Sequence, residues 1–131
     1  ADDAAERVAA VHSGWRGTVA GVVAQAIAAL VAAGAAPARL RAAIGPCISA
    51  AAFEVGPEVA ALFPAEHVDR AYPRPHVDLV AVVRDQLLAA GLPAAAIERI
   101  GGCTYREPDR YFSYRRDGAG IGQHLAFIGW A

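Results

Sequence analysis

Methionine and lysine are missing from this 131-residue chain, and cysteine occurs only twice. Without methionine the sequence has no translation start, so we expect a processed, truncated or partial gene product. All 12 basic residues are arginine, a bias that carries no functional information. The cysteines, Cys47 and Cys103, stand far apart and form no CxxC pattern. A disulfide framework is therefore not expected, and a reducing cytoplasm is the predicted location.

The chain also lacks an excess of charge of either sign. Its formal net charge is −1, and 19% of its residues are charged while 56% are hydrophobic. A nucleic-acid-binding surface normally shows a basic excess, and a disordered chain has few apolar residues, so we expect neither class. The length fits one domain over residues 1–131 with a real core.

Neither a signal peptide nor a membrane span is predicted. Charged residues at positions 2, 3, 6 and 7 occupy the place where a signal peptide needs an apolar stretch. No charge occurs between Arg16 and Arg39, a gap long enough to cross a bilayer. However, the large residues in this gap recur at helical spacing on one face, which indicates a buried helix.

Apolar periodicity and the positions of glycine and proline predict alternating strands and helices. Strands are expected at 7–11, 40–44, 68–72, 97–100 and, as a closing pair, at 111–115 and 124–130. Helices are expected at 17–33, 56–62 and 79–90. This alternation predicts an α+β (mixed α/β) domain with helices packed on the outside of β-sheet layers.

The run VHSGWRG at positions 11–17 carries the strongest functional signal. It places His12 at the end of a strand-like segment and Arg16 at the mouth of a long helix. An imidazole there can bind a metal, and Arg16 with the N–H groups of a helix start can hold an anion. Alternatively, Trp15 packs in the core and Arg16 pairs with a nearby carboxylate. From the residues alone, both interpretations stand.

Other candidates carry weaker signals. Cys47 or Cys103 can act as a nucleophile beside a histidine base, although a buried, inert thiol is the commoner role. His76, just before a helix, is a ligand candidate or a neighbour of the helix cap. The run YFSYRRD at 111–117 is either an edge strand with a solvated charged end or an aromatic, anion-binding rim.

Several of these segments, in this order, resemble the laccase-domain family of YfiH-type polyphenol oxidases. The run HSGWRG at 12–17 is similar to the family's HAGWRG motif, and IGP at 44–46 with FEVG at 53–56 is similar to its next segment. The pairs DL at 78–79 and QL at 86–87, then CTY at 103–105 and FSYRRD at 112–117, match its later motifs. The resemblance implies a YfiH-like fold whose N-terminal part is missing here.

The same resemblance implies a zinc-dependent purine nucleoside phosphorylase that also deaminates adenosine. Its substrates would be a purine nucleoside and phosphate. His12 would be a catalytic metal ligand, Arg16 would hold phosphate beside Gly14, and Tyr114 and Arg115 would bind the nucleoside. Copper oxidation, the family's older assignment, fits poorly because a multicopper site needs several histidines.

Two departures from the family limit this expectation. The family's V-H-G and A-D-C segments, which supply the other two zinc ligands, do not occur here. One imidazole cannot build a tetrahedral site, so the fragment alone is expected to be inactive and to bind zinc weakly. Gly122-Gln123 also replaces the family's frequent Gly-Arg pair. A cysteine hydrolase and a non-catalytic interaction domain remain as alternatives.

Overall fold

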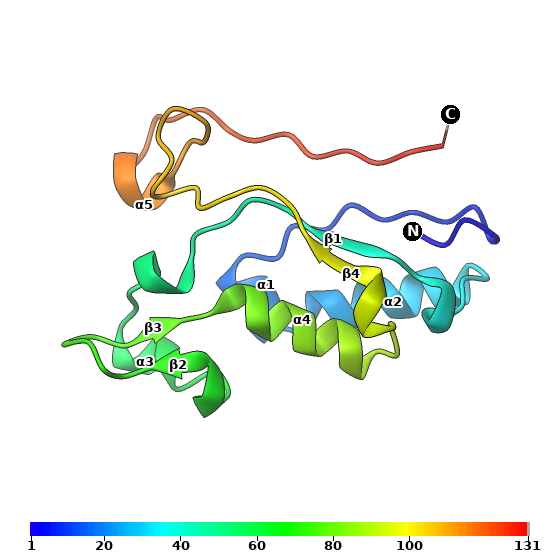
Figure 1. The fold of residues 1–131 in the computed structure, drawn as a ribbon, viewed down its shortest axis with the longest axis horizontal. Coiled ribbons are helices and arrows are strands. Elements are labelled where there is room, and N and C mark those ends of the chain that lie inside the picture. The colour runs from blue at the N-terminus through cyan, green and yellow to red at the C-terminus, as the bar shows by residue number, and fades with distance from the viewer. Residues whose placement is uncertain (131) are drawn as a thin grey trace. The chain divides into compact units, whose positions relative to one another are not determined.

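The structure is a computed structural model that describes residues 1–130 (Figure 1). The chain divides into two compact units. The first unit contains Ala1–Ile44, Ala81–Arg99 and the residues from Ala126 onward, and the second contains Gly45–Val80 and Ile100–Leu125. Each unit is therefore assembled from segments that are distant in the sequence.

Two helices replace the single helix that was expected at 17–33. They are α1 (Trp15–Val19) and α2 (Val22–Ala32). The break falls at Gly21, whose φ of 75° places it in the left-handed region. A right-handed helix cannot continue through this conformation, which glycine adopts without steric cost. The continuous helix prediction was wrong for this reason.

The sheet of the first unit consists of β1 (Ala42–Ile44) and β4 (Ile97–Arg99), which run parallel with Ala42 opposite Ile97. Both strands are shorter than predicted. Between them in the sequence lies α4 (Leu79–Ala89), which begins directly after Asp78 as expected. Gly91, with a φ of 93°, follows its end. A helix connecting two parallel strands is the usual solution, because such strands need a long crossover.

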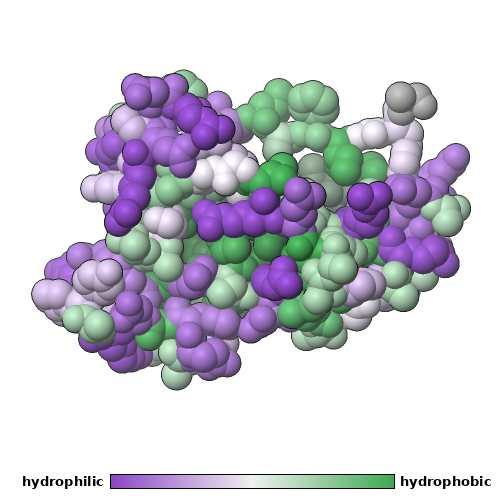
Figure 2. All heavy atoms as spheres, in the orientation of Figure 1, coloured by the Kyte–Doolittle hydropathy of each residue, from purple (hydrophilic) through white to green (hydrophobic). Residues whose placement is uncertain are grey.

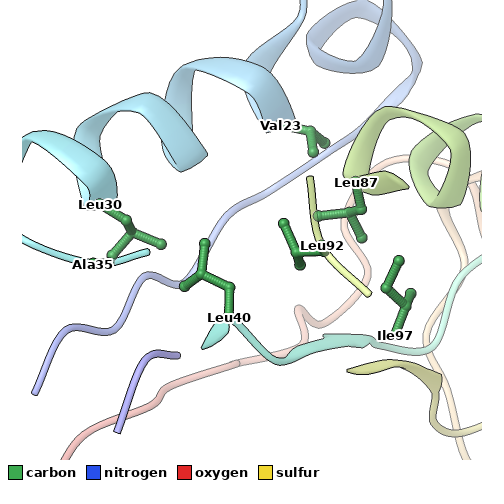
Figure 3. Packing of buried hydrophobic residues seen from close by; sticks show 7 residues of the cluster. All are labelled: Val23, Leu30, Ala35, Leu40, Leu87, Leu92 and Ile97. Atoms are coloured by element: carbon green, nitrogen blue, oxygen red, sulfur yellow. The ribbon is translucent and has the colours of Figure 1, made fainter. Parts of the chain in front are cut away.

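The core of the first unit lies between α2, α4 and β4 (Figure 3). Its buried members are Val23, Leu30, Ala35, Leu40, Leu87, Leu92 and Ile97. Figure 3 shows these side chains converging from both helices and from the segment that leads into β1. The apolar periodicity of the sequence therefore correctly predicted which faces of α2 and α4 point into the core.

The second unit holds α3 (Pro57–Ala60), β2 (Val68–Asp69), β3 (His76–Val77) and α5 (Tyr114–Asp117). Helix α3 confirms the prediction at 56–62 and begins with Pro57, which suits a first helical position. Strand β3 was missed because its flanking prolines predicted a loop. It pairs antiparallel with β2, and Val77 is fully buried.

Three predicted strands do not form. Residues 8–14 and 121–130 contain neither helix nor strand, and the stretch at 114–117 is the short helix α5. A strand needs a neighbour to satisfy its backbone N–H and C=O groups, and no neighbour is paired with these segments within residues 1–130. Their large side chains are exposed, with Leu125 at 87% and Phe127 at 88%. Hydrophobic residues are accordingly open at the molecular surface (Figure 2).

None of the helices in the part of the chain that the structure describes could cross a membrane.

Candidate functional site

His12 lies in the loop that precedes α1, and its side chain is exposed. Gly14 is the residue before that helix, with φ −67° and ψ 167°, a conformation open to any residue. A Cβ placed on Gly14 would lie 3.1 Å from Nε2 of His12. The imidazole therefore lies close to Gly14, and a side chain at this position would require the ring to move by a few tenths of an ångström. The sequence did not reveal this proximity.

Thr18 fixes the shape of this loop. Its side chain is completely buried, and its hydroxyl lies 3.0 Å from the Gly14 carbonyl and 2.9 Å from the Ser13 hydroxyl. At the end of α1, Gln86 of α4 donates to the Thr18 carbonyl at 3.0 Å. A buried hydroxyl with these partners holds the loop in one conformation. Thr18 was not predicted, although it is the polar residue between Gly17 and Val19 in an otherwise apolar stretch.

Arg16 is exposed, and its guanidinium carbon lies 4.4 Å from the centroid of the Trp15 ring. The ion pairs of Arg39 with Asp2, Arg74 with Glu54, Arg110 with Glu107 and Arg116 with Asp117 do not include Arg16. The alternative in which Arg16 pairs with a nearby carboxylate stays a prediction. The prediction that a long helix begins beside Arg16 and holds an anion at its N-terminus is wrong, since α1 spans only five residues. Anion binding here would depend on the guanidinium itself.

The residues around His12 do not make a metal site on their own. Among residues 1–130, no three His, Cys, Asp or Glu side chains gather into a group able to hold a metal ion. A zinc site has three or four protein ligands, and His12 offers one imidazole. The residues present therefore fit one position of such a site and not the whole of it.

Tyr114 and Arg115 belong to the second unit. Arg115 donates to the Glu54 carbonyl at 2.6 Å, and its guanidinium lies 5.3 Å from the centroid of the Phe53 ring. The FEVG and FSYRRD motifs, distant in the sequence, thus meet through this arginine. Tyr114 is 74% exposed. Its ring is open to a ligand, whereas Arg115 is partly engaged by the protein.

Arg116 organises the loop around α5, a role that the sequence did not predict. Its guanidinium donates to the carbonyls of Thr104 (2.8 Å), Tyr105 (2.9 Å) and Tyr111 (2.8 Å). It also forms a two-point ion pair with Asp117, each hydrogen bond being 2.8 Å long. This contact holds the pKa of Asp117 below its usual value. The adjacent Arg-Asp pair in the sequence was the available signal.

His76 and His124, two of the three histidines of the second unit, have structural partners. His76 is buried in β3, with Nδ1 3.1 Å from the Arg74 carbonyl and its ring 4.3 Å from that of Tyr72. It was expected in a loop beside the helix cap. His124 accepts a hydrogen bond from the Phe112 N–H at 3.1 Å through Nε2. These contacts favour structural roles for both rings.

Two curated proteins are similar in sequence to this chain over almost its whole length. A purine nucleoside phosphorylase of Xylella fastidiosa is 39% identical over 130 residues, which cover 93% of this chain and 49% of that protein. Adenosine deaminase RL5, from an unknown prokaryotic organism, is 38% identical over 135 residues, covering 97% and 52%. The chain thus spans about half the length of the curated relatives that it matches.

Solved structures agree with the fold. YlmD from Geobacillus stearothermophilus matches with a TM-score of 0.77 at 32% identity, over 86% of this chain and 45% of that one. A Bacillus licheniformis hypothetical protein, YfiH, matches with a TM-score of 0.76 at 31% identity, over 82% and 44%. The mixed α/β fold class and the resemblance read from the motifs are confirmed. Because the family model of the multi-copper polyphenol oxidoreductase laccases matches residues 1–131, the chain belongs to that family.

Proposed function

We propose that this chain contributes one part of the active site of a zinc-dependent purine nucleoside phosphorylase that also deaminates adenosine. The observation that carries the proposal is the loop before α1. It presents the exposed imidazole of His12, close to Gly14, and the exposed guanidinium of Arg16. The names of the relatives supply the reaction and the substrate class.

In this proposal each residue of the loop has a separate task. His12 is one metal ligand, and its ring orientation depends on the space that Gly14 leaves. Arg16 binds phosphate, because the planar fork of a guanidinium matches two phosphate oxygens at once. Thr18 keeps both side chains in place through its buried hydroxyl. Within residues 1–130 no group of three potential ligands includes His12, so the other zinc ligands would come from elsewhere.

Tyr114 and Arg115 are proposed to bind the nucleoside. The exposed ring of Tyr114 offers an aromatic face of the kind on which purines stack. Arg115 is held by the Glu54 carbonyl, so its plane is preorganised and part of its hydrogen-bonding capacity remains. Preorganised donors bind a ligand at a lower entropic cost than mobile ones.

The necessary partner in this proposal is a further segment that corresponds to the other half of the relatives. Three observations support it: the chain spans about half of their length, residues 8–14 and 121–130 have no strand partner, and large apolar side chains are exposed. Val11, Leu125 and Phe127 are 43%, 87% and 88% exposed. A segment that pairs with these backbones would also bring the remaining metal ligands.

The test compares the 131-residue chain with a polypeptide that also carries the other half of the family fold. Both are incubated with inosine and phosphate, and hypoxanthine release and bound zinc are measured. We expect turnover and zinc only in the longer polypeptide. There, His12→Ala should remove both, and Arg16→Ala should raise the KM for phosphate by about 10- to 100-fold, the effect of one charge-assisted hydrogen bond.

Arg70→Ala is the matched control, because Arg70 is an exposed arginine next to β2 in the other unit. It should leave the phosphate KM unchanged. Undiminished phosphorolysis in the His12→Ala protein would refute the proposal. So would a folded longer polypeptide with neither zinc nor turnover.

A further inference from the structure

Cys47 and Cys103 are distant in the sequence but lie directly opposite each other in the second unit. They form an isolated parallel β-bridge, next to a hydrogen bond of 3.1 Å from the Thr104 N–H to the Cys47 carbonyl. Both are present as thiols. Their proximity could not be predicted from the sequence, since neither is part of a CxxC pattern.

The backbone geometry of such a bridge suits a disulfide bond. Adjacent β backbones lie about 4.7–4.9 Å apart. Disulfides join Cα atoms that are about 4.4–6.8 Å apart, provided that the Cβ vectors do not diverge. Residues opposite each other in a ladder point to the same face of the sheet, so their side chains do not diverge. We therefore expect rotation of the two side chains to bring the sulfur atoms within bonding distance.

The surroundings of Cys103 favour its thiolate. The Ser49 N–H donates to Cys103 Sγ at 3.3 Å. Burial alone raises the pKa of this thiol, but hydrogen bonds from Ser49, Arg106 and Tyr105 lower it by more, so the net pKa is below the usual value. The Ser49 hydroxyl, buried without a well-formed hydrogen bond, lies close enough to contribute. Cys47 is half-buried and gives solvent access to the pair.

We propose that Cys47 and Cys103 form a reversible intramolecular disulfide when a hydroperoxide oxidises the protein. The Cys103 thiolate attacks the peroxide, the O–O bond breaks, and a sulfenic acid forms as water leaves. The Cys47 thiol then attacks that sulfur, the S–O bond breaks, and a second water leaves. Two thiols lose two electrons and two protons, and one molecule of hydrogen peroxide becomes two of water. A dithiol reverses the reaction by exchange.

The bond would act on the loop that carries Tyr114 and Arg115. Cys103 donates through its N–H to Glu107 at 2.7 Å, and the next two residues give their carbonyls to Arg116. Cross-linking Cys103 to Cys47 would therefore anchor the base of this loop covalently. The inference stands on the second unit alone and does not depend on the proposed nucleoside chemistry.

The experiment treats the purified 131-residue chain with hydrogen peroxide and then measures its thiols and its intact mass. We expect both thiols to disappear, the mass to fall by about 2 Da with loss of two hydrogens, and dithiothreitol to restore both. The protein should stay monomeric on a non-reducing gel. In urea, where the fold no longer holds the cysteines together, the same bond should form more slowly.

Single variants identify the order of the steps. Cys47→Ser should leave Cys103 as a sulfenic acid that dimedone labels, and Cys103→Ser should react with peroxide much more slowly. Circular dichroism establishes that each variant is folded, while the mass of the wild-type protein tests the bond without any variant. Two thiols that survive oxidation would overturn the proposal. Disulfides formed only between chains, or equal rates in urea and in buffer, would do the same.

Discussion

The carboxylate of Asp2 is buried and joined to the guanidinium of Arg39 by an ion pair of 2.9 Å. It also accepts hydrogen bonds from the N–H groups of Ala36 at 2.8 Å and of Ala4 and Ala5 at 3.1 and 3.2 Å. These contacts fasten the beginning of the described chain to the segment that enters β1. Because that segment contributes Leu40 to the core, the ion pair links the N-terminal residues to the packing of the first unit.

This carboxylate makes stability depend on pH. The hydrogen bond from Arg39, followed by the one from Ala36, lowers the pKa of Asp2 from 3.8 to about 2. The folded state then binds fewer protons than the unfolded state, so ionised Asp2 adds stability above the unfolded pKa. That stability is lost as the pH falls from 3.8 towards about 2. Asp2→Asn should therefore be less stable than the wild type at neutral pH, and the difference should shrink as the pH falls from 3.8 through about 2.

Urea unfolding between neutral pH and pH 2 measures this effect, with Asp3→Asn as control because Asp3 is exposed. The Asp3 variant should follow the wild-type curve. Parallel curves for wild type and Asp2→Asn would contradict the role of the ion pair.

Gly14→Ala should disturb His12 without unfolding the protein. The φ and ψ angles of Gly14 suit alanine, so the free energy of unfolding should stay within about 1 kcal/mol of the wild-type value. The new Cβ would stand 3.1 Å from Nε2 and push the ring aside by a few tenths of an ångström. NMR resonances of the His12 ring should therefore shift. Gly45→Ala, where a Cβ meets no atom within 4 Å, should leave them in place, and identical spectra for both variants would exclude the contact.

Thr18→Val should lower the free energy of unfolding by about 1–3 kcal/mol, because the part-buried Ser13 hydroxyl loses its partner while the shape is kept. The Gly14 carbonyl loses one of its two donors and keeps the Thr18 N–H at 2.9 Å. Thr18→Ser retains the hydroxyl and should restore the hydrogen bonds, at the cost of one methyl group. Hydrogen exchange at 13–17 reports on the loop directly. Equal protection in the valine and serine variants would rule out the hydroxyl as the fastening group.

Leu40→Ala should cost about 2–5 kcal/mol, the usual range for truncating a large buried side chain. Leu40 is 1% exposed and lies in the core cluster. Leu125→Ala is the matched control, since Leu125 is 87% exposed, and it should change stability by less than about 0.5 kcal/mol. Chemical denaturation of both variants gives the comparison. A larger loss at position 125 than at position 40 would place the core elsewhere.

Arg116→Lys should lower stability by about 1.5–3 kcal/mol, because a lysine ammonium cannot reproduce the planar set of donors that holds three carbonyls and Asp117. Arg115→Lys should have a smaller effect on stability, since the hydrogen bond of Arg115 goes to a single carbonyl, that of Glu54. Proteolysis of the 101–117 segment distinguishes the two. Equal cleavage rates would show that Arg116 is not the organiser of this loop.

The sequence predicted best the elements that local rules determine. Helix α4 follows from its apolar period and from its boundaries at Asp78 and Gly91. Helix α3 follows from Pro57. Strands β1 and β4 were placed correctly because short apolar runs end at turn residues, although periodicity could not give their partners. The HSGWRG, FEVG and FSYRRD motifs, which identified the family, were also readable without a structure.

The features that the sequence did not predict depend on contacts between distant residues. Residues 7–11 and 124–130 have strand-like composition, but composition cannot supply a neighbouring strand. The split between α1 and α2 depends on the left-handed conformation of Gly21. The sequence does not reveal this conformation, because a glycine can also lie inside a continuous helix. Cys47 and Cys103 lie opposite each other because of the register between their two backbone segments, which the sequence does not show. Thr18 and Arg116 became visible only with the backbone carbonyls that they contact.

The parallel pairing of β1 with β4 constrains how fast the first unit can fold. Helices α2 and α4 are local structures of the kind that form in about 0.1–1 μs. The two strands can meet only after the whole intervening chain, from Ile44 to Ile97, has been brought back on itself, and this closure costs entropy before any strand contact repays it. We therefore expect refolding to be limited by this closure. Lengthening an exposed loop between the strands should slow refolding, whereas stabilising α2 should not accelerate it.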